Sequence, residues 1–255
     1  PWWRVKKKAG HFYNGMSRGD HRGTMMFASS LCVDTASQAA EMIDYFADIR
    51  AYLETIEPPA YPRAIDPTLA AQGKELFECN CAGCHGTYDV DPDKETFPNL
   101  LIPLEVIGTD PLLGDSSTEE VSALVDWYNE SFYGTITQLV VEQPFVGYTA
   151  PPLDGIWATA PFFHNGSVPT LELVLDSSKR PSYWRRENYD SQNYDWNALG
   201  WVWQELDDGQ SDAPIGQAKH IYDTTILGHD NGGHTFGDHL SDDERAAVLE
   251  YLESI

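Results

Sequence analysis

The sequence lacks a long apolar stretch and is poor in positive charge. No run of about 18 apolar residues occurs in the 255 residues, so a membrane-spanning helix is not expected. Lys and Arg number 16 against 40 Asp and Glu, which gives a net charge of −24. Because phosphate groups would be repelled by this negative charge, it argues against nucleic acid and anionic membranes as partners. A basic protein partner or a divalent cation is compatible with it.

The sequence also lacks an initiator methionine and a signal peptide. It opens with Pro1 and Trp2, and no apolar stretch follows the basic residues from Arg4 to Lys8. We therefore expect a processed or partial product, from which a leader or a longer upstream region is missing. The content of hydrophobic residues (42%) and aromatic residues (12%) is sufficient for a packed core.

Cysteine is scarce, with four in the chain, and three of these stand close together. Cys81, Cys84 and His85 form the pattern Cys-x-x-Cys-His, which is typical of covalent c-type haem attachment. Two thiols at this spacing can reach the two vinyl groups of one porphyrin, and the adjacent imidazole can then bind the iron. A redox dithiol would need a thioredoxin-like strand before the motif, and a zinc site would need a second Cys/His pair. The sequence shows neither and predicts one haem c.

The two remaining cysteines, Cys32 and Cys79, can form a disulfide in an oxidising compartment. Alternatively, Cys79 is a free thiol buried beside the haem. Because haem c is attached after export, we expect a periplasmic or extracellular protein.

Methionine is absent after the haem motif, although the sixth iron ligand of a small haem domain normally comes from that part of the chain. A bis-histidine iron is therefore favoured, and the loss of methionine ligation should lower the reduction potential. The candidates are His164, His220, His229, His234 and His239. His234 is the favoured sixth ligand because it stands in the glycine-rich loop 228–237, which can pass close to a flat macrocycle. His164 is the second candidate. An open sixth position, which would admit peroxide or oxygen, is the third alternative.

Helical signals flank the haem motif. Asp66 as N-cap with Pro67 at the first helical position predicts a helix that runs into the motif. Ser241 and Glu244 form a capping box that predicts a final helix over 241–254. In small haem domains two such helices cross near the haem edge.

The predicted fold is mainly α, a cytochrome c-like haem domain with long irregular loop elaborations. Residues 1–65 are expected to form an N-terminal irregular segment plus a helix and a Pro-rich linker, and residues 66–255 the haem domain with long insertions. Further helices are predicted over 35–57, 117–132 and 168–175, and few regular signals occur in 1–33, 87–116 and 176–240.

Several separate motifs resemble the di-haem cytochrome c peroxidases and their MauG relatives, closest to the branch that contains the rubber oxygenases. They are the opening from Pro1 to His21, the Cys81–His85 motif with Gly86, the segment 148–171 and the ending from Gly237. The resemblance covers nearly the whole chain.

This resemblance implies a two-domain scheme. Family members have an N-terminal haem domain, where oxygen or peroxide reacts, and a C-terminal one that relays electrons. The chain resembles only the C-terminal domain, which makes His85 the proximal and His234 the distal ligand of the electron-transfer haem. The first Cys-x-x-Cys-His, which catalysis in the family needs, is absent here. Relatives also bind calcium between the domains, so this chain is a possible calcium binder as well. Its site is not assigned, because the sequence contains no pattern of a calcium loop.

Three functions are therefore weighed. The favoured one is electron transfer through one covalent haem, within a larger multi-haem protein or assembly whose partner is another haem domain, a redox protein or a copy of this chain. The second is a peroxidase or oxygenase that uses this haem or a missing second one, with His164 or His21 as acid–base group. The third is a subunit of a polymeric extracellular cytochrome. No catalytic residue is assigned, and whether the chain is an enzyme is left open.

Overall fold

A computed structural model describes residues 1–15, 17–18, 20–115, 119–140 and 146–255, which form two compact units. Unit 1 consists of Pro1–Pro58, Asn99–Pro103 and Leu113–Pro152, and unit 2 of Pro59–Pro98, Leu104–Leu112 and Leu153–Ile255. The chain passes from unit 1 to unit 2 after Pro58, and it returns to unit 1 at Asn99 and again at Leu113. The units are thus interleaved along the sequence, and the predicted division at residue 65 stays a prediction.

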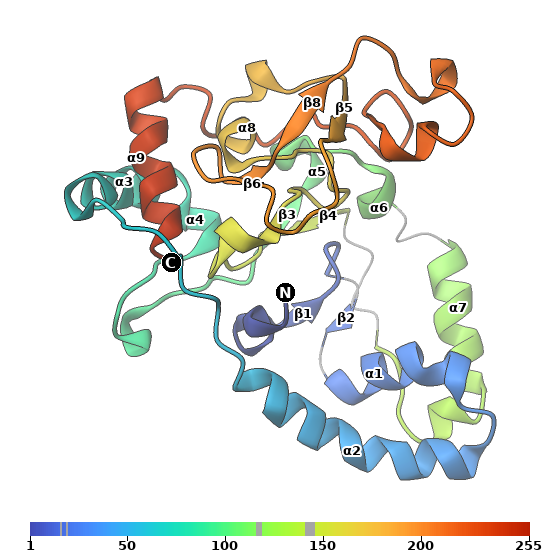
Figure 1. Ribbon diagram of the computed structural model, residues 1–255. Coiled ribbons are helices and arrows are strands. Elements are labelled where there is room, and N and C mark those ends of the chain that lie inside the picture. The colour runs from blue at the N-terminus through green and yellow to red at the C-terminus, as the bar shows by residue number, and fades with distance from the viewer. Residues whose placement is uncertain (16, 19, 116–118, 141–145) are drawn as a thin grey trace. The chain divides into compact units, whose positions relative to one another are not determined.

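Unit 1 is mainly helical. Its helices are α1 (His21–Ser29), α2 (Ala36–Glu54) and α7 (Glu119–Glu130), with the 3-10 helices η1 (Trp2–Lys7), η2 (Ser30–Cys32) and η4 (Tyr133–Thr135) (Figure 1). Two antiparallel strand pairs complete it, β1 (Gly10–His11) with β2 (Ser17–Arg18) and β3 (Leu101–Pro103) with β4 (Gly147–Thr149). Its core contains Met26, Phe46, Tyr128 and Tyr133.

Helix α2 begins as predicted, whereas α1 was not expected. The Thr35 hydroxyl accepts the Gln38 N–H at 3.3 Å, and α2 ends at Glu54, shortly before the two prolines. Helix α1 is capped by Asp20, which accepts the Arg22 N–H at 3.0 Å. The first four residues of α1, His21 to Thr24, are polar or lack a side chain, so the sequence shows no apolar periodicity that would predict this short helix. The capping box predicted at residues 117–120 begins outside the described residues.

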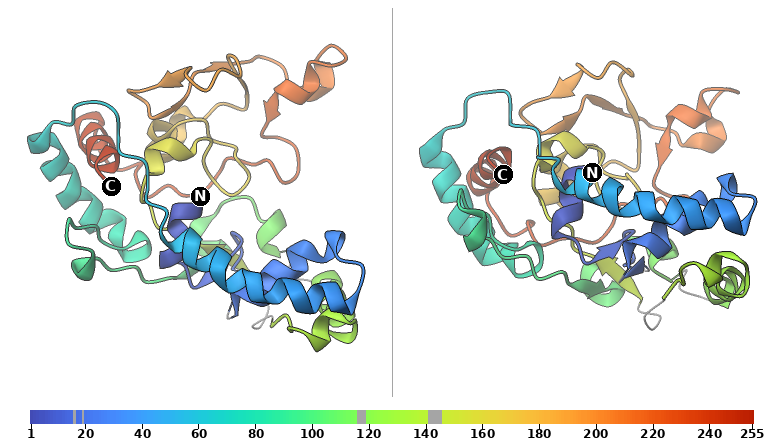
Figure 2. Two further views of the ribbon diagram at one scale, coloured as in Figure 1. Left: turned by 60° about the horizontal axis from the view of Figure 1, so that its bottom comes forward. Right: turned by 90° about the horizontal axis from the view of Figure 1, so that it is seen from below.

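Unit 2 contains the helix pair that the sequence predicted. Helix α3 (Pro67–Asn80) is capped by Asp66, and α9 (Asp242–Glu253) by a capping box of Ser241 and Glu244. The two helices lie side by side in Figures 1 and 2. They approach so closely at Gly73 that a Cβ atom there would lie 1.8 Å from the Ala247 carbonyl oxygen.

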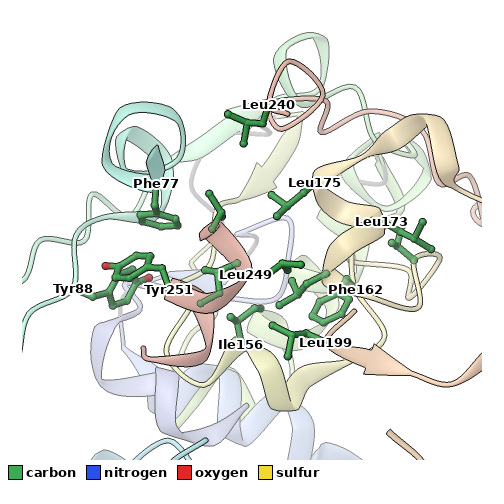
Figure 3. Packing of buried hydrophobic residues seen from close by; sticks show 14 residues of the cluster. Phe77, Tyr88, Ile156, Phe162, Leu173, Leu175, Leu199, Leu240, Leu249 and Tyr251 are labelled. Carbon is green, nitrogen blue, oxygen red and sulfur yellow. The ribbon is translucent and has the colours of Figure 1, made fainter. Parts of the chain in front are cut away.

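The core of unit 2 surrounds this helix pair. The ring of Phe77 on α3 lies 5.3 Å from that of Tyr251 on α9 and 6.0 Å from that of Tyr88, measured between centroids (Figure 3). The other buried core side chains come from the segment before α8 (Leu171–Leu175), from α8, from the chain between α8 and α9, and from α9. They include Ile156, Phe162, Val168, Leu173, Leu175, Leu199, Leu240, Val248 and Leu249.

The segment 176–240 is more regular than predicted. It contains a three-stranded antiparallel sheet with β5 (Tyr183–Arg186) between β8 (Trp203–Glu205) and β9 (Tyr222–Asp223). Trp184 at its centre is 2% exposed and stacks on Tyr222 at 5.2 Å. The remaining elements are α4 (Ala82–His85), η3 (Pro92–Lys94), α5 (Leu104–Ile107), α6 (Leu112–Asp115), η5 (Ile156–Thr159), η6 (Ser177–Lys179), β6 (Tyr194–Asp195), β7 (Gly200–Trp201), η7 (Gln210–Asp212) and η8 (Ala218–His220). The fold is therefore partly helical, with several short strands.

Candidate haem site

The Cys-x-x-Cys-His motif forms one helical turn at the end of α3. Helix α3 stops at Asn80, the Cys81 N–H still donates to the Phe77 carbonyl at 2.8 Å, and helix α4 follows at once. The His85 N–H donates to the Cys81 carbonyl at 3.0 Å. Residues three and four apart share one face of a helix, so Cys81, Cys84 and His85 project to the same side.

The backbone after His85 is fixed from two directions. Gly86 has φ +80°, and a Cβ atom there would lie 1.9 Å from the Thr96 carbonyl oxygen, so no other residue fits. The Tyr88 hydroxyl donates to the His85 carbonyl at 3.0 Å and accepts the Leu153 N–H at 2.5 Å. The backbone at His85 and Gly86 is thus fixed by the hydrogen bond from Tyr88 and by the close approach of residue 96.

The structure brings His234 opposite His85. The centroids of their rings lie 6.2 Å apart. Two imidazoles that bind one metal ion from opposite sides, with metal–nitrogen distances of about 2.0–2.1 Å, have centroids separated by roughly 6 Å. The separation therefore suits two axial ligands of a single iron.

The surroundings of His234 are apolar. Its ring lies 5.8 Å from that of Phe163 and 5.3 Å from that of Phe236. Burial, and after it the charges of His85 and Arg180, lower its pKa to about 4, which keeps the imidazole neutral as a metal ligand must be. Within the described residues its buried Nδ1 has no hydrogen-bond partner. An unpaired buried nitrogen is costly unless a ligand satisfies it, so these residues fit a haem.

The motif cysteines also fit covalent attachment better than a redox dithiol. Burial raises the pKa of the Cys81 thiol to about 11, with a further contribution from Cys84, and burial raises the pKa of Cys84 as well. The nucleophilic thiol of a redox dithiol has a lowered pKa instead.

The backbone of loop 228–237 is held by a second loop of unit 2. The His234 N–H donates to the Ile107 carbonyl at 2.7 Å. Gly233, at φ +71°, lies so close to Gly108 that a Cβ atom on it would be 2.2 Å from the Gly108 carbonyl carbon. Sequence reasoning gave no sign of this contact, because the two residues are 125 positions apart.

The other candidate histidines lie in different surroundings. His164 is half-buried, and burial lowers its pKa while the charge of Asp110 raises it. The His229 ring packs on Tyr222 at 5.1 Å, and His220 hydrogen-bonds to the exposed Tyr189. His21 belongs to unit 1, where its Nε2 lies 3.3 Å from the Phe46 carbonyl oxygen.

The two other cysteines are exposed free thiols, Cys32 in unit 1 and Cys79 in unit 2. The alternative of a Cys79 thiol buried beside the haem is therefore wrong, because the end of α3 leaves this side chain outside. Their disulfide stays a prediction. The described part of the chain contains no cluster of three or more His, Cys, Asp or Glu that could hold a metal ion, so calcium is not placed. In the same residues no helix has the length and apolar character of a membrane span.

Sequence reasoning missed Arg180. Its guanidinium donates to carbonyls of the His234 loop, yet nothing in the local sequence distinguishes it from the other basic residues.

Two curated proteins of Sinorhizobium fredii (strain NBRC 101917 / NGR234) are similar to most of the chain. The uncharacterized protein y4iJ is 28% identical over 295 aligned residues, which cover 90% of this chain and 47% of that protein. The uncharacterized protein y4iM is 31% identical over 205 residues, which cover 72% of this chain and 44% of that protein. The chain thus spans less than half the length of either relative.

A family model matches a shorter part of the chain. The match covers residues 147–185, which include Phe163 and Arg180. The matching family is described as RoxA-like, cytochrome c-like. The match supports a cytochrome c-like domain, whose cofactor is haem c, and it supports the resemblance to the rubber-oxygenase branch.

Proposed function

We propose that this chain is an electron-transfer domain with one haem c, attached through Cys81 and Cys84 and bound axially by His85 and His234. The observation that carries the proposal is the 6.2 Å separation of the two imidazole rings, one of which has a buried and unpaired Nδ1. We further propose that it works in the periplasm or outside the cell.

The residues of the site favour electron relay over substrate turnover. A bound haem supplies a one-electron change at iron. His85 and His234 would hold the iron of a bound haem from two sides, and with both imidazoles bound neither peroxide nor oxygen would have a free position. The rings of Phe163 and Phe236 pack against the His234 imidazole and give it apolar neighbours.

We propose that the partner is another haem domain, in the same polypeptide or assembly, or a redox protein. The relatives are more than twice as long as the part that this chain matches, which is compatible with a further domain. The net charge of −24 favours a basic docking surface on any separate partner.

The proposal is tested by the ferric absorption spectrum of the protein matured with its haem. The expected spectrum is low-spin and does not change on addition of cyanide or peroxide. His234→Ala should produce a high-spin spectrum and allow cyanide to bind, and added imidazole should restore the low-spin form. A high-spin spectrum of the unmodified protein, or peroxide turnover, would refute the relay and favour the enzyme.

His164→Ala is the matched control, because His164 is the second candidate for the distal position. It should leave the low-spin spectrum unchanged. If His164→Ala opens the site and His234→Ala does not, the assignment of the distal ligand is wrong. For the attachment itself, Cys81→Ser with Cys84→Ser should abolish covalent pigment in the intact mass, whereas Cys79→Ser should retain it.

A further inference from the structure

Arg180 is bonded in an unusual way for a charged residue. Among the described residues, its guanidinium donates to five main-chain carbonyls: Leu173 at 2.8 Å, Val174 at 3.1 Å, Asn231 at 2.7 Å, Gly233 at 2.7 Å and His234 at 3.3 Å. The first two belong to α8 and the last three to the loop of the candidate distal ligand. One side chain therefore fastens that loop to a helix of the core.

Arginine is suited to this arrangement, because its planar group carries five N–H donors in fixed directions and remains charged. Burial lowers the pKa of Arg180 to about 10, opposed by the charges of Asp238, Asp176 and Asp230. A largely buried cation is costly to desolvate. The five hydrogen bonds of the guanidinium offset this cost.

Arg180 also lies over the ring of Phe163, which packs against the His234 imidazole. Its guanidinium carbon lies 4.9 Å from the centroid of the Phe163 ring, which in turn packs against the His234 ring at 5.8 Å. Arg180 thus contacts both the main chain of His234 and an aromatic ring that packs against the His234 imidazole.

The backbone of the loop needs such support. Gly233 has φ +71° and His234 has φ +46°, so two successive residues occupy the left-handed region. A residue other than glycine is uncommon there, and the conformation costs free energy that surrounding contacts must supply. Two of the Arg180 bonds end on the carbonyls of these two residues.

We propose that Arg180 is the positioning residue of the distal ligand: its bonds to the 231–234 carbonyls and its contact with Phe163 hold the His234 imidazole in the direction of His85. This inference rests on the proposed function. Without Arg180 the loop would sample conformations in which His234 turns away from the iron, and the sixth position would open for part of the time.

The test compares three variants of the protein matured with its haem. Arg180→Gln should bind cyanide and show a high-spin fraction in the ferric spectrum, whereas the unmodified protein should do neither. Arg180→Lys keeps the charge but cannot reach all five carbonyls, so its cyanide binding should lie between the two. Added imidazole should restore the low-spin spectrum of Arg180→Gln, which a general loss of structure would not allow.

Arg245→Gln is the matched control. Arg245 is another largely buried arginine of unit 2, and it donates to the carbonyls of Leu175, Gly237 and Asp238, not to residues 231–234. It should lower thermal stability without opening the haem. If Arg245→Gln binds cyanide as fast as Arg180→Gln, or if both Arg180 variants remain closed, the positioning role is refuted. If the unmodified protein is already high-spin, the proposed function fails instead.

Discussion

His85 is held by regular secondary structure, whereas His234 is held by loop backbone. On the proximal side, α3 runs directly into the haem motif, and α9 packs on α3 at Gly73. On the distal side, hydrogen bonds from Arg180 and Asn165 and a contact with the loop at Gly108 take the place of helices. The position of His85 thus depends on close helix packing and that of His234 on a small number of polar bonds, which predicts different responses to mutation.

The largest expected effect is at the helix crossing. Gly73→Ala would place its Cβ atom 1.8 Å from the Ala247 carbonyl oxygen, so α3 and α9 must separate. We expect a loss of about 3 kcal/mol in the free energy of unfolding, measured by urea denaturation. Gly83→Ala is the control, since a Cβ atom there meets nothing within 4 Å, and it should be neutral or stabilising by up to about 1 kcal/mol. Equal effects of the two changes would contradict the close crossing.

An intermediate effect is expected in the distal loop. The Asn165 amide donates to the carbonyls of Gly228 at 3.2 Å and of Asp230 at 2.9 Å. Asn165→Ala should cost about 1 kcal/mol, because one partly buried and one exposed hydrogen bond are lost. Amide exchange should accelerate over 228–237 and stay unchanged in α3.

The control for this prediction is Asn193→Ala. The Asn193 amide makes an exposed bond to Glu187, and its loss should change the free energy of unfolding by less than about 0.5 kcal/mol. Faster exchange spread evenly over unit 2 in Asn165→Ala would show that the two sides do not differ in the proposed way.

The smallest expected effect is a pH dependence at the end of the proximal helix pair. Burial raises the pKa of the Glu253 carboxyl to about 7, and Glu250 adds to the rise, while the hydrogen bond with Tyr61 opposes it. The folded protein keeps this proton where the unfolded chain, with a pKa of 4.5, has lost it. The contribution of Glu253 to stability is therefore complete below pH 4.5 and is lost as the pH rises to 7.

Glu253→Gln should flatten this decline in a series of melting temperatures from pH 4.5 to 7. Glu75→Gln, on an exposed position of α3, should leave the decline as it is. An unchanged slope in Glu253→Gln would remove this group from the pH response.

The same contrast explains what the sequence could predict. Asp66 and Ser241 act through neighbouring residues, so both helix starts could be inferred from local patterns. The Cys81–His85 motif is equally local, and His85 as proximal ligand stays a prediction. His234 could be nominated from its glycine-rich loop, but its approach to His85 depends on Arg180 and Ile107, which are far away in the sequence. The sheet around Trp184 was missed because its strands are only two to four residues long and lie in a polar segment.

The contact between Gly108 and Gly233 places a constraint on how this protein can change in evolution. The two chain segments meet through main-chain atoms, so Gly233 cannot acquire a side chain unless the segment at Gly108 moves away, whereas a Cβ atom on Gly108 would lie 3.4 Å from the Gly233 Cα atom. The contact requires that Ile107 directly precedes Gly108 and that His234 directly follows Gly233, because the His234 N–H donates to the Ile107 carbonyl. An insertion at either glycine would displace the distal imidazole even though it alters no residue of the site.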